Sequence, residues 1–503
     1  MHRVVRAAVE VERTYDLPAG GGPLPDLSGV AAVVPLGTED LDATYHDTAD
    51  LRLARSRATL RRRTGGRDAG WHLKLPAGAG RLELTAPLRG TGVPAALRAL
   101  VRSRSLGAPL QPVLRLRTTR SVLQLQDGTG RVLAEVADDT VTAEVLLDPP
   151  ATSSWREVEV ELVDGDTALL DAVEQQLRGW GARPAGTASK LARALEAHLP
   201  DPPVDDLRTA GGVVVAHLRA QVDELVQAEP GVRRDEPDAV HRARVATRRL
   251  RSALRTFRPL LDRGTTEPLR EELRHLAAVL GPARDAEVQR DRLLAHLASE
   301  PPELVLGPVV QRVRDELDGR HREARAAVVR ALDGRRHLEL LQSLDRLVTA
   351  PPLTERAGRP AARELPRLVA RSWHRLATAH AAAQAAGGRE DLLHEVRKRA
   401  KAARYAGEAV APALGRDAER FAARAEKVQE VLGEVSDSAV SRSLLRELGV
   451  VAHLAGENGF TFGRLHGLEE MRAERARARY DGAWAALDRR KVRAWLGLSL
   501  IHI

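Results

Sequence analysis

Apolar and polar residues alternate in short segments over residues 1–198, and glycine or proline separates one segment from the next. This period-two alternation with hairpin-like breaks predicts an antiparallel sheet or barrel. Helical patterns interrupt or close it near 94–105, 166–180 and 188–198. The alternating segments are VEVERTY, TLRRRT, WHLKLP, RLELTAPL, PVLRLRTTRSVLQLQ, RVLAEVADDTV and WREVEVELV.

A second region, 208–503, follows the Pro- and Asp-rich linker 199–207 and has the pattern of long Ala-, Leu- and Arg-rich helices. A Pro/Gly stretch divides it into parts of about 208–350 and 361–503, and these parts repeat each other. HRARVATRRLRSALRTF at 241 aligns with HEVRKRAKAARYAGEAV at 394, and LGPARDAEV at 280 aligns with LGEVSDSAV at 432. The sequence therefore predicts an α+β protein of two domains, the second containing a duplicated helical unit.

Charged residues share one face of each predicted strand, because side chains two apart on a strand point the same way. Such a face ordinarily meets water, but a solvated sheet mixes charge signs across strands, whereas here the first and last strands are acidic and several middle strands basic. If this face is enclosed, clustered carboxylates require a divalent cation and arginine forks match phosphate oxygens. The charged sets are Glu10 and Glu12; Arg61 and Arg63; His72 and Lys74; Arg81 and Glu83; Arg115 and Arg117; and Glu157, Glu159 and Glu161.

These segments resemble the CYTH domain, the triphosphate tunnel metalloenzyme family, over about 1–198. EVERT matches the two glutamates of the family's opening Glu-x-Glu-x-Lys strand, with Thr14 at the lysine position, and YHDTADLRL, TLRRR, WHLKLP, RLE, RLR, REVEVEL and SKLARAL follow in the family's order. The resemblance implies an eight-stranded antiparallel tunnel that binds triphosphates with Mg²⁺ or Mn²⁺.

The resemblance also implies the roles of individual residues. The metal ligands would be Glu10, Glu12, and one or two of Glu157, Glu159 and Glu161. The catalytic residues would be Glu10, Glu12, Lys74 and Glu83. The phosphate-binding residues would be Arg61, Arg63, Lys74, Arg81, Arg115, Arg117 and Lys190.

A basic stripe marks the repeated helix of the second region. At 100° per residue the histidine and arginines of the first copy fall on one stripe, with an apolar stripe beside them. A basic stripe on one helix is ordinarily a solvated face, but its recurrence in the second copy predicts a groove for a multivalent anion. The stripe residues are His241, Arg244, Arg248, Arg251 and Arg255 in the first copy and His394, Arg397, Lys401 and Arg404 in the second.

This half resembles the CHAD domain over about 206–503, on its His-Arg helices and on LGPARDAEV and LGEVSDSAV, which we expect to be turns. The resemblance implies two pseudo-symmetric four-helix bundles whose basic inner surface binds inorganic polyphosphate. Asp285 and Asp437 are expected to be structural, as helix caps or as partners of an arginine.

Composition narrows the function classes. The net charge of +9, with 78 Lys and Arg, predicts a polyanionic partner, although 72 of these residues are arginine, so placement matters more than number. The chain has no cysteine, which excludes thiolate chemistry and disulfides. Aromatic residues form only 3% of the chain, so a nucleic acid is expected only as a non-specific polyanion. We expect a cytoplasmic protein that can associate with polyphosphate granules, with no membrane and no obligate protein partner.

Two readings of the first domain stay open at this point. Either it is a metal-dependent inorganic triphosphatase, or the whole protein is a non-catalytic polyphosphate-granule adaptor with an inactive tunnel. Thr14 bears on this choice, because a threonine hydroxyl cannot supply the point charge of a lysine at a phosphate chain. Organic triphosphate hydrolysis, adenylate cyclisation and nucleic-acid binding are the less favoured alternatives.

Overall fold

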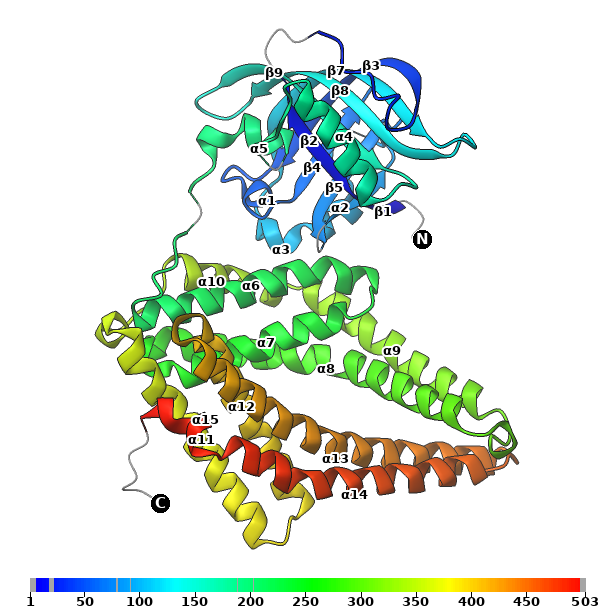
Figure 1. Cartoon of the computed structure of the whole chain (residues 1–503). Helices are drawn as coiled ribbons and strands as arrows, with labels where there is room; N and C mark the ends of the chain where they lie inside the picture. The colour runs from blue at the N-terminus through cyan, green and yellow to red at the C-terminus, as the bar shows by residue number, and fades with distance from the viewer. Residues whose placement is uncertain are drawn as a thin grey trace. The chain divides into compact units, whose positions relative to one another are not determined.

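The chain forms two compact units, Met1–Pro202 and Pro203–Ile503, in a computed structural model (Figure 1). We call them the sheet unit and the helical unit. The structure describes residues 6–17, 22–77, 80–90, 92–187, 189–201 and 203–497, and for residues 6–10 it describes the backbone only.

One antiparallel sheet forms the sheet unit, with the order β1-β6-β5-β4-β3-β7-β8-β9-β2-β10. Its strands are β1 (Arg6–Glu10), β2 (Glu12–Asp16), β3 (Ala32–Asp47), β4 (Thr59–Thr64), β5 (Gly70–Ala77), β6 (Gly80–Ala86), β7 (Gln111–Gln126), β8 (Val132–Val145), β9 (Ala151–Leu162) and β10 (Arg183–Pro184).

The N-terminal segment connects the two ends of this sheet. Its first half, β1, pairs with β6, and its second half, β2, pairs with β9. Only Val11 separates the two halves, and its carbonyl accepts a hydrogen bond from the amide of Leu162 at 3.0 Å. With β1 and β2 taken as one strand and the two-residue β10 set aside, eight strands remain, as the resemblance to the CYTH domain implied.

Helices cover the apolar outer faces of β5 and β9, which is why the charged faces of these strands turn inward. The helices of the sheet unit are α1 (Arg52–Arg55), α2 (Ala95–Leu100), α3 (Arg102–Ser105), α4 (Thr167–Gly179) and α5 (Lys190–Ala194). Val158 and Val160 of β9 pack with Leu170 and Val173 of α4 in one buried cluster. In another, Trp71 and its neighbours on β5 pack with residues of α2. Burial of these apolar faces, at about 25 cal/mol per Å², fixes the orientation of each strand.

The helical unit consists of two matching sets of helices. The first set is α6 (Ala210–Arg234), α7 (Ala239–Thr256), α8 (Arg263–Ser299), α9 (Val309–Asp333) and α10 (Arg335–Thr349). The second is α11 (Ala361–Ala385), α12 (Glu390–Leu414), α13 (Arg416–Leu454), α14 (Phe460–Leu487) and α15 (Arg490–Arg493). Each set contains four long helices, and the fifth shrinks from 15 residues in α10 to four in α15.

Two long hairpins, α8–α9 and α13–α14, converge at their far ends in Figure 1. A buried cluster joins them there, including Leu293, Val313, Leu445 and Phe462. The stretches LGPARDAEV and LGEVSDSAV lie inside α8 and α13, so the prediction that they form turns was wrong. They are helical because both hairpins pack along their length, which a short Gly-containing stretch does not interrupt.

No helix in the described part of the chain combines the length and the apolar character that a membrane crossing requires.

Candidate functional sites: a basic groove and a charged tunnel

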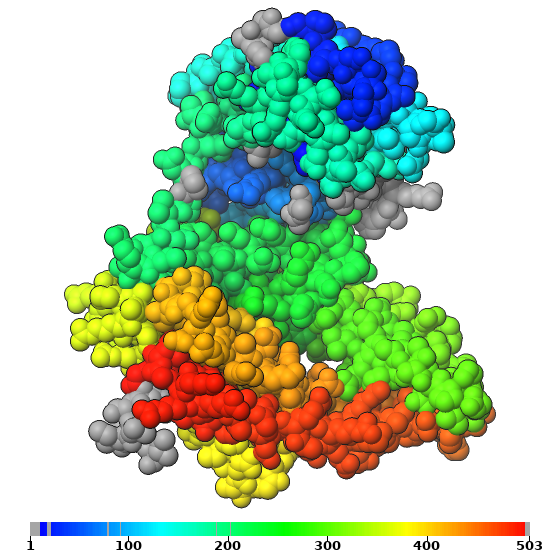
Figure 2. Space-filling view, viewed as in Figure 1, coloured from blue at the N-terminus to red at the C-terminus, as the bar shows by residue number. Residues whose placement is uncertain are grey.

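A groove lies between the two sets of helices, with α7 and α12 facing each other and α8 and α13 beside them. Figure 2 shows the helical unit hollowed between the green segment of α8 and the orange segment of α12 and α13. The groove encloses about 920 Å³. Its basic lining residues are His241, Arg244, Arg248 and Arg284 from the first set and His394, Arg397, Lys398 and Lys401 from the second.

The two repeats build the groove in the same way. Arg244 forms an ion pair with Asp285 at 2.6 Å, and Arg397 approaches Asp437 at 3.6 Å. Asp285 and Asp437 therefore orient arginines, which is the second of the two structural roles expected for them, and neither caps a helix because both lie inside long helices. The structure also brings together the predicted residues His241, Arg248, His394 and Lys401.

The groove concentrates more positive charge than its acids neutralise. Burial, together with Arg248 and Arg397, lowers the pKa of Lys401 from 10.5 to about 7. Burial and neighbouring cations lower the pKa values of His241 and His394 as well, so both imidazoles are neutral at pH 7. An anion that enters the groove relieves this repulsion, and its charge raises the pKa of Lys401 again.

The outer part of each stripe differs between the repeats. Arg251 and Arg255 line a second cavity that adjoins the groove. Arg404, the counterpart of Arg251, instead pairs with Glu408 at 2.6 Å and with Glu426 at 2.7 Å. The structure therefore does not bring Arg404 to the groove, because nearby carboxylates hold its side chain.

A small charged cavity of about 40 Å³ lies inside the sheet unit. Strands β2 to β6 and β9 contribute to its wall, together with the segment that leads into α5. Seven predicted residues line it: Glu12, Arg61, Lys74, Arg81, Glu157, Glu159 and Lys190. Thr14 also lines it, directly opposite Glu159 in the register of β2 and β9. We call this cavity the tunnel site.

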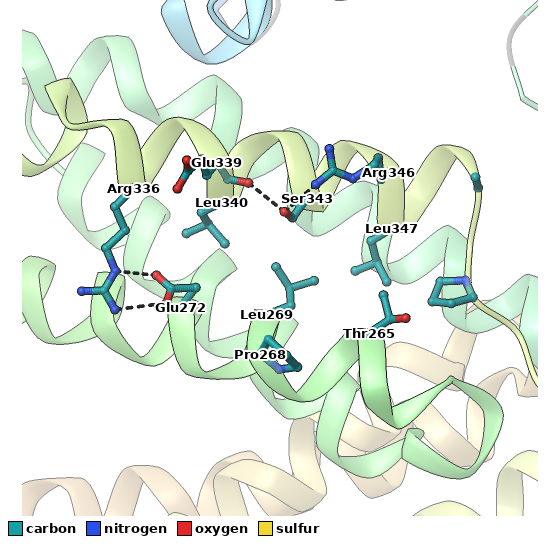
Figure 3. A pocket seen from close by; sticks show the side chains of 12 residues that line it. Thr265, Pro268, Leu269, Glu272, Arg336, Glu339, Leu340, Ser343, Arg346 and Leu347 are labelled. Atoms are coloured by element: carbon teal, nitrogen blue, oxygen red, sulfur yellow. Dashed lines mark hydrogen bonds and ion pairs between the residues drawn. The ribbon is translucent and has the colours of Figure 1, made fainter.

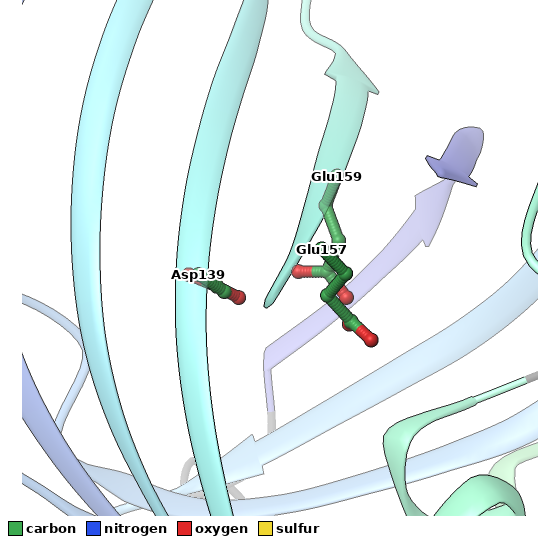
Figure 4. Close-up of side chains that lie close together, drawn as sticks. All are labelled: Asp139, Glu157 and Glu159. Carbon is green, nitrogen blue, oxygen red and sulfur yellow. The ribbon is translucent and has the colours of Figure 1, made fainter. Parts of the chain in front are cut away.

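Three carboxylates meet beside the tunnel site, Asp139 of β8 with Glu157 and Glu159 of β9 (Figure 4). One oxygen from each lies within 4.8 Å of the others, and we call them the acid cluster. Lys190 Nζ contacts all three, at 3.0 Å from Asp139, 2.5 Å from Glu157 and 2.6 Å from Glu159. The ammonium group therefore already neutralises part of the charge that a cation would neutralise.

Arg120 completes this network by binding Asp139 and Glu159, each at 2.6 Å. Burial alone would raise the pKa of Glu159, but the charges of Lys190 and Arg120 lower it well below its ordinary value. Burial would likewise lower the pKa of Lys190, and the three carboxylates raise it above its ordinary value instead. Lys190, which we predicted to bind phosphate, is thus held by protein carboxylates.

Glu12 and Glu161 are further candidate ligands for a divalent cation, and unlike the acid cluster neither forms an ion pair among the described residues. They lie directly opposite each other on β2 and β9, and Glu159 is two residues from Glu161 on the same face. Burial raises the pKa of Glu161, and the charges of Glu12 and Glu159 raise it further. Oxygen ligands on adjacent strands suit Mg²⁺ or Mn²⁺. Glu10 ends β1, and its side chain lies outside the described residues.

Arg63 and Glu83 lie on the inner face of the strands but are not part of the tunnel-site wall. Arg63 pairs with Asp68, and burial with the nearby Arg61 and Arg120 lowers its pKa to about 9. Glu83 lies opposite Lys74 in the register of β5 and β6. Its carboxylate forms a hydrogen bond with His72 Nδ1 at 2.9 Å.

Arg115 and Arg117 lie on the opposite face of β7, so the prediction that they enter the tunnel was wrong. Arg115 pairs with Asp42 at 2.5 Å, and Arg117 is exposed. Leu114 and Leu116, which alternate with these arginines, face inward and pack with Leu191 and Leu195 around α5. At the N-terminal end of β7, the apolar face of the strand is therefore the inner one.

Sequence reasoning missed Arg120 and Asp139, which face each other across β7 and β8. The sequence contained a signal for both, because each is a charged residue within a predicted strand segment. Arg120 lies three positions after Arg117, which places it on the other face of the strand.

A further cavity of about 590 Å³ lies between α8 and α10 (Figure 3). Leu269, Leu340 and Leu347 give it apolar walls. At one end Arg336 Nε donates to Glu272 at 2.6 Å, so this arginine already has a carboxylate partner. The cavity lacks the unneutralised charge of the groove.

Comparisons with known proteins agree with the division of the chain into a sheet unit and a helical unit. The CYTH domain family matches residues 24–193, and the CHAD domain family matches residues 216–446. Proteins from two strains of Mycobacterium tuberculosis, uncharacterized protein MT2285 and uncharacterized protein Rv2226, are each 40% identical over 514 residues, covering 96% of both chains.

The solved structures that match this chain are less similar to it in sequence. PptA from Streptomyces chartreusis is 22% identical, with a TM-score of 0.46, over 55% of this chain and 99% of its own. The CHAD domain from the plant Ricinus communis is 22% identical, with a TM-score of 0.42, over 60% of this chain and 96% of its own. With an N-terminal CYTH domain and a C-terminal CHAD domain, this chain belongs to the family of CYTH–CHAD proteins.

Proposed function

We propose that this protein binds inorganic polyphosphate in the groove of its helical unit. The observation that carries the proposal is the set of eight basic side chains that α7, α8 and α12 direct into one groove. Guanidinium groups match phosphate oxygens bidentately, and several in a row suit a ligand with many phosphates. A nucleic acid is a weaker candidate, because Tyr405 is the one aromatic residue among the residues that line the groove and its adjoining cavity.

A binding competition tests this proposal. Fluorescent long-chain polyphosphate is titrated with the full-length protein and then displaced with unlabelled polyphosphate or with single-stranded RNA of equal total charge. We expect polyphosphate to displace the probe at a far lower concentration than RNA, with an affinity that falls as salt rises. Equal displacement by RNA, or no binding of the probe, would contradict the proposal.

For the sheet unit, we propose that the tunnel site binds a triphosphate or the end of a polyphosphate chain together with Mg²⁺ or Mn²⁺. Glu12, Glu159 and Glu161 would hold the cation, which when bound neutralises phosphate charge. Arg61, Lys74 and Arg81 line the wall and orient phosphate oxygens. The cavity of about 40 Å³ has room for little more than a water molecule. Phosphate entry therefore requires the side chains that line this cavity to move apart.

Hydrolysis of the bound end, as a metal-dependent inorganic triphosphatase, is the second candidate activity. The Arg61, Lys74 and Arg81 wall favours it, because phosphoryl transfer depends mainly on positioning and charge neutralisation. Thr14 works against it, since no ammonium group is present at this position of β2. We infer that the wild-type tunnel binds phosphate well and turns it over slowly.

The substitution Thr14→Lys separates binding from turnover. Phosphate release is measured with triphosphate, long polyphosphate and ATP, each with Mg²⁺ and Mn²⁺, for the wild type and the variant. We expect slow release by the wild type and at least tenfold faster release by Thr14→Lys, with Thr14→Ser as the matched control. Fast release by the wild type would make the protein an active triphosphatase and refute the inference of slow turnover.

A further inference from the structure

The two ends of the groove differ in charge. At the N-terminal end of α12, Glu390 and Asp391 line the groove, each paired with an arginine outside its wall, so this end attracts an anionic chain less than the rest of the groove does. At the other end, the wall passes from Arg248 to Arg251 and Arg255 along α7. An anionic polymer in the groove is therefore drawn toward the C-terminal end of α7.

Two further cavities continue the groove in this direction. The second cavity shares Arg248, Lys398 and Lys401 with the groove, so the two are contiguous. A third, of about 590 Å³, shares Arg255 and Arg270 with the second. We call this third cavity the exit pocket. Beyond the shared residues, its basic wall consists of Arg258, Arg263, Arg371, Arg375 and Arg399.

No aspartate or glutamate is among the residues that line the exit pocket, all of which the structure describes. Arg258 pairs with Glu267, and Arg399 pairs with Glu395, both outside the wall. In the described part of the chain no carboxylate forms an ion pair with Arg371 or Arg375. Burial lowers the pKa of Arg255, and Arg399 and Arg375 lower it further. Arg270 also pairs with Glu267, at 2.6 Å. The pocket thus gathers more guanidinium groups than the carboxylates around it neutralise, and these groups repel one another.

The second repeat has no such continuation. Arg251 and Arg255 correspond to Arg404 and Glu408, since both pairs lie 153 positions apart in the alignment of the two repeated helices. Arg404 and Glu408 neutralise each other at 2.6 Å, and Arg249 also binds Glu408 at 2.9 Å. The basic surface therefore leaves the groove on one side only.

We propose that the exit pocket is a second binding site for the same polyanion, and that a polyphosphate chain leaves the groove in one direction, over Arg251 and Arg255, to reach it. This inference rests on the proposed binding of polyphosphate in the groove. His241 and Arg255 are 14 residues apart on one helix, about 21 Å at 1.5 Å per residue. Only a chain longer than this span fills both sites, so the exit pocket favours long chains over short ones.

The double variant Arg371→Gln/Arg375→Gln tests the exit pocket, because both side chains are on the exposed face of α11 and are remote from the groove wall. The control is Arg335→Gln/Arg320→Gln, which removes two exposed arginines that line none of the three cavities. A third variant, Arg244→Gln/Arg397→Gln, weakens the groove itself. Affinities for a short polyphosphate that fits the groove and for a long one are measured by calorimetry at several salt concentrations.

We expect the exit-pocket variant to bind the short chain within twofold of the wild type and the long chain at least tenfold more weakly. For the long chain, the slope of the logarithm of affinity against the logarithm of salt concentration should become about two units shallower, one for each lost phosphate contact. Unchanged long-chain affinity, or equal losses for both lengths, would overturn the exit pocket while leaving the groove intact. If the wild type bound neither length, or the groove variant bound both normally, the proposed function itself would fail.

Discussion

The two units both gather basic side chains, but they neutralise them differently. In the sheet unit, Lys190 lies within 3.0 Å of all three carboxylates of the acid cluster. In the helical unit, Lys401 forms no ion pair among the described residues, and its pKa is lowered to about 7 by burial and by the surrounding arginines. The tunnel site is therefore stabilised by internal pairing, whereas the groove stays electrostatically strained until an anion binds.

This difference separates stability from binding. Breaking a buried ion pair leaves an uncompensated charge and destabilises the fold. Removing one of several like charges relieves repulsion in the free protein and weakens the bound state. Substitutions in the sheet unit should therefore act first on stability, and substitutions in the groove should act first on affinity.

The largest effect on affinity is expected from Arg248→Glu/Lys401→Glu, which reverses two charges at the centre of the groove. Carboxylates there repel phosphate and pair with the remaining arginines, so polyphosphate affinity should fall about a thousandfold, or roughly 4 kcal/mol. Fluorescence polarisation measures the loss, and circular dichroism checks the fold. A loss of less than about tenfold would show that polyphosphate binds elsewhere on the chain.

Lys190→Gln should destabilise the sheet unit by about 3–5 kcal/mol, because it leaves the acid cluster without its main cation. Urea unfolding followed by tryptophan fluorescence measures the change. Trp71, Trp155 and Trp180 belong to this unit and Trp373, Trp484 and Trp495 to the helical unit, so only the transition of the sheet unit should shift in the variant. The matched control, Lys427→Gln, breaks an exposed pair with Glu430 and should cost less than about 1 kcal/mol.

The same variant sharpens the comparison with the groove. Without the ammonium group, the acid cluster keeps Arg120 as a partner of Asp139 and Glu159 but carries excess negative charge, so Mn²⁺ should restore part of the lost stability by binding the folded state. If Lys190→Gln were as stable as the wild type without added cation, the contacts of Lys190 with the acid cluster would not stabilise the sheet unit.

Glu161→Gln should weaken Mn²⁺ binding to the sheet unit by about ten- to a hundredfold, a typical loss when a metal site is disturbed. Isothermal titration with Mn²⁺ measures the affinity in the wild type and in the variant. Glu144→Gln is the control, because Glu144 lies opposite Arg115 on the other face of the sheet. Equal Mn²⁺ affinity in Glu161→Gln and the wild type would place the cation elsewhere.

The groove was predictable from the sequence because two independent signals, the helical periodicity of the basic residues and their recurrence in the second repeat, indicate the same pair of facing helices. His241 and Arg244 recur as His394 and Arg397, so two stripes with apolar faces beside them had to meet across a shared core. The fate of Arg404 was not predictable. Its partner Glu426 lies on α13, and only the packing of α12 on α13 brings the two together.

The sheet unit was predictable in its strands and in most of its inner face, but not in the orientation of β7. Alternation defines two faces and does not say which one is enclosed. On β9 the covering helix α4 selects the valine face as the outer one, whereas on β7 the entry of α5 places leucines inside. Arg115 and Arg117 were therefore assigned to the wrong face, and Arg120 was missed.

The smallest effect, about tenfold, is expected from pH. Because the pKa of Lys401 is about 7 in the free protein, this side chain is largely charged at pH 6 and largely neutral at pH 8. A bound polyanion favours the charged form and raises this pKa, so binding takes up a proton at pH 8 and affinity decreases as pH rises. Burial and the neighbouring cations lower the pKa values of His241 and His394, so neither imidazole is expected to account for the change between pH 7 and pH 8.

Calorimetry at pH 6, 7 and 8 in buffers of different ionisation enthalpy measures both the affinity and the proton uptake. Lys401→Arg keeps its charge throughout this range, so it should bind with nearly constant affinity and take up no proton. If Lys401→Arg retained the full pH dependence, another group would be the one that titrates. The contrast between the units would then weaken, because the groove lysine would carry a stable charge, as Lys190 does within the acid cluster.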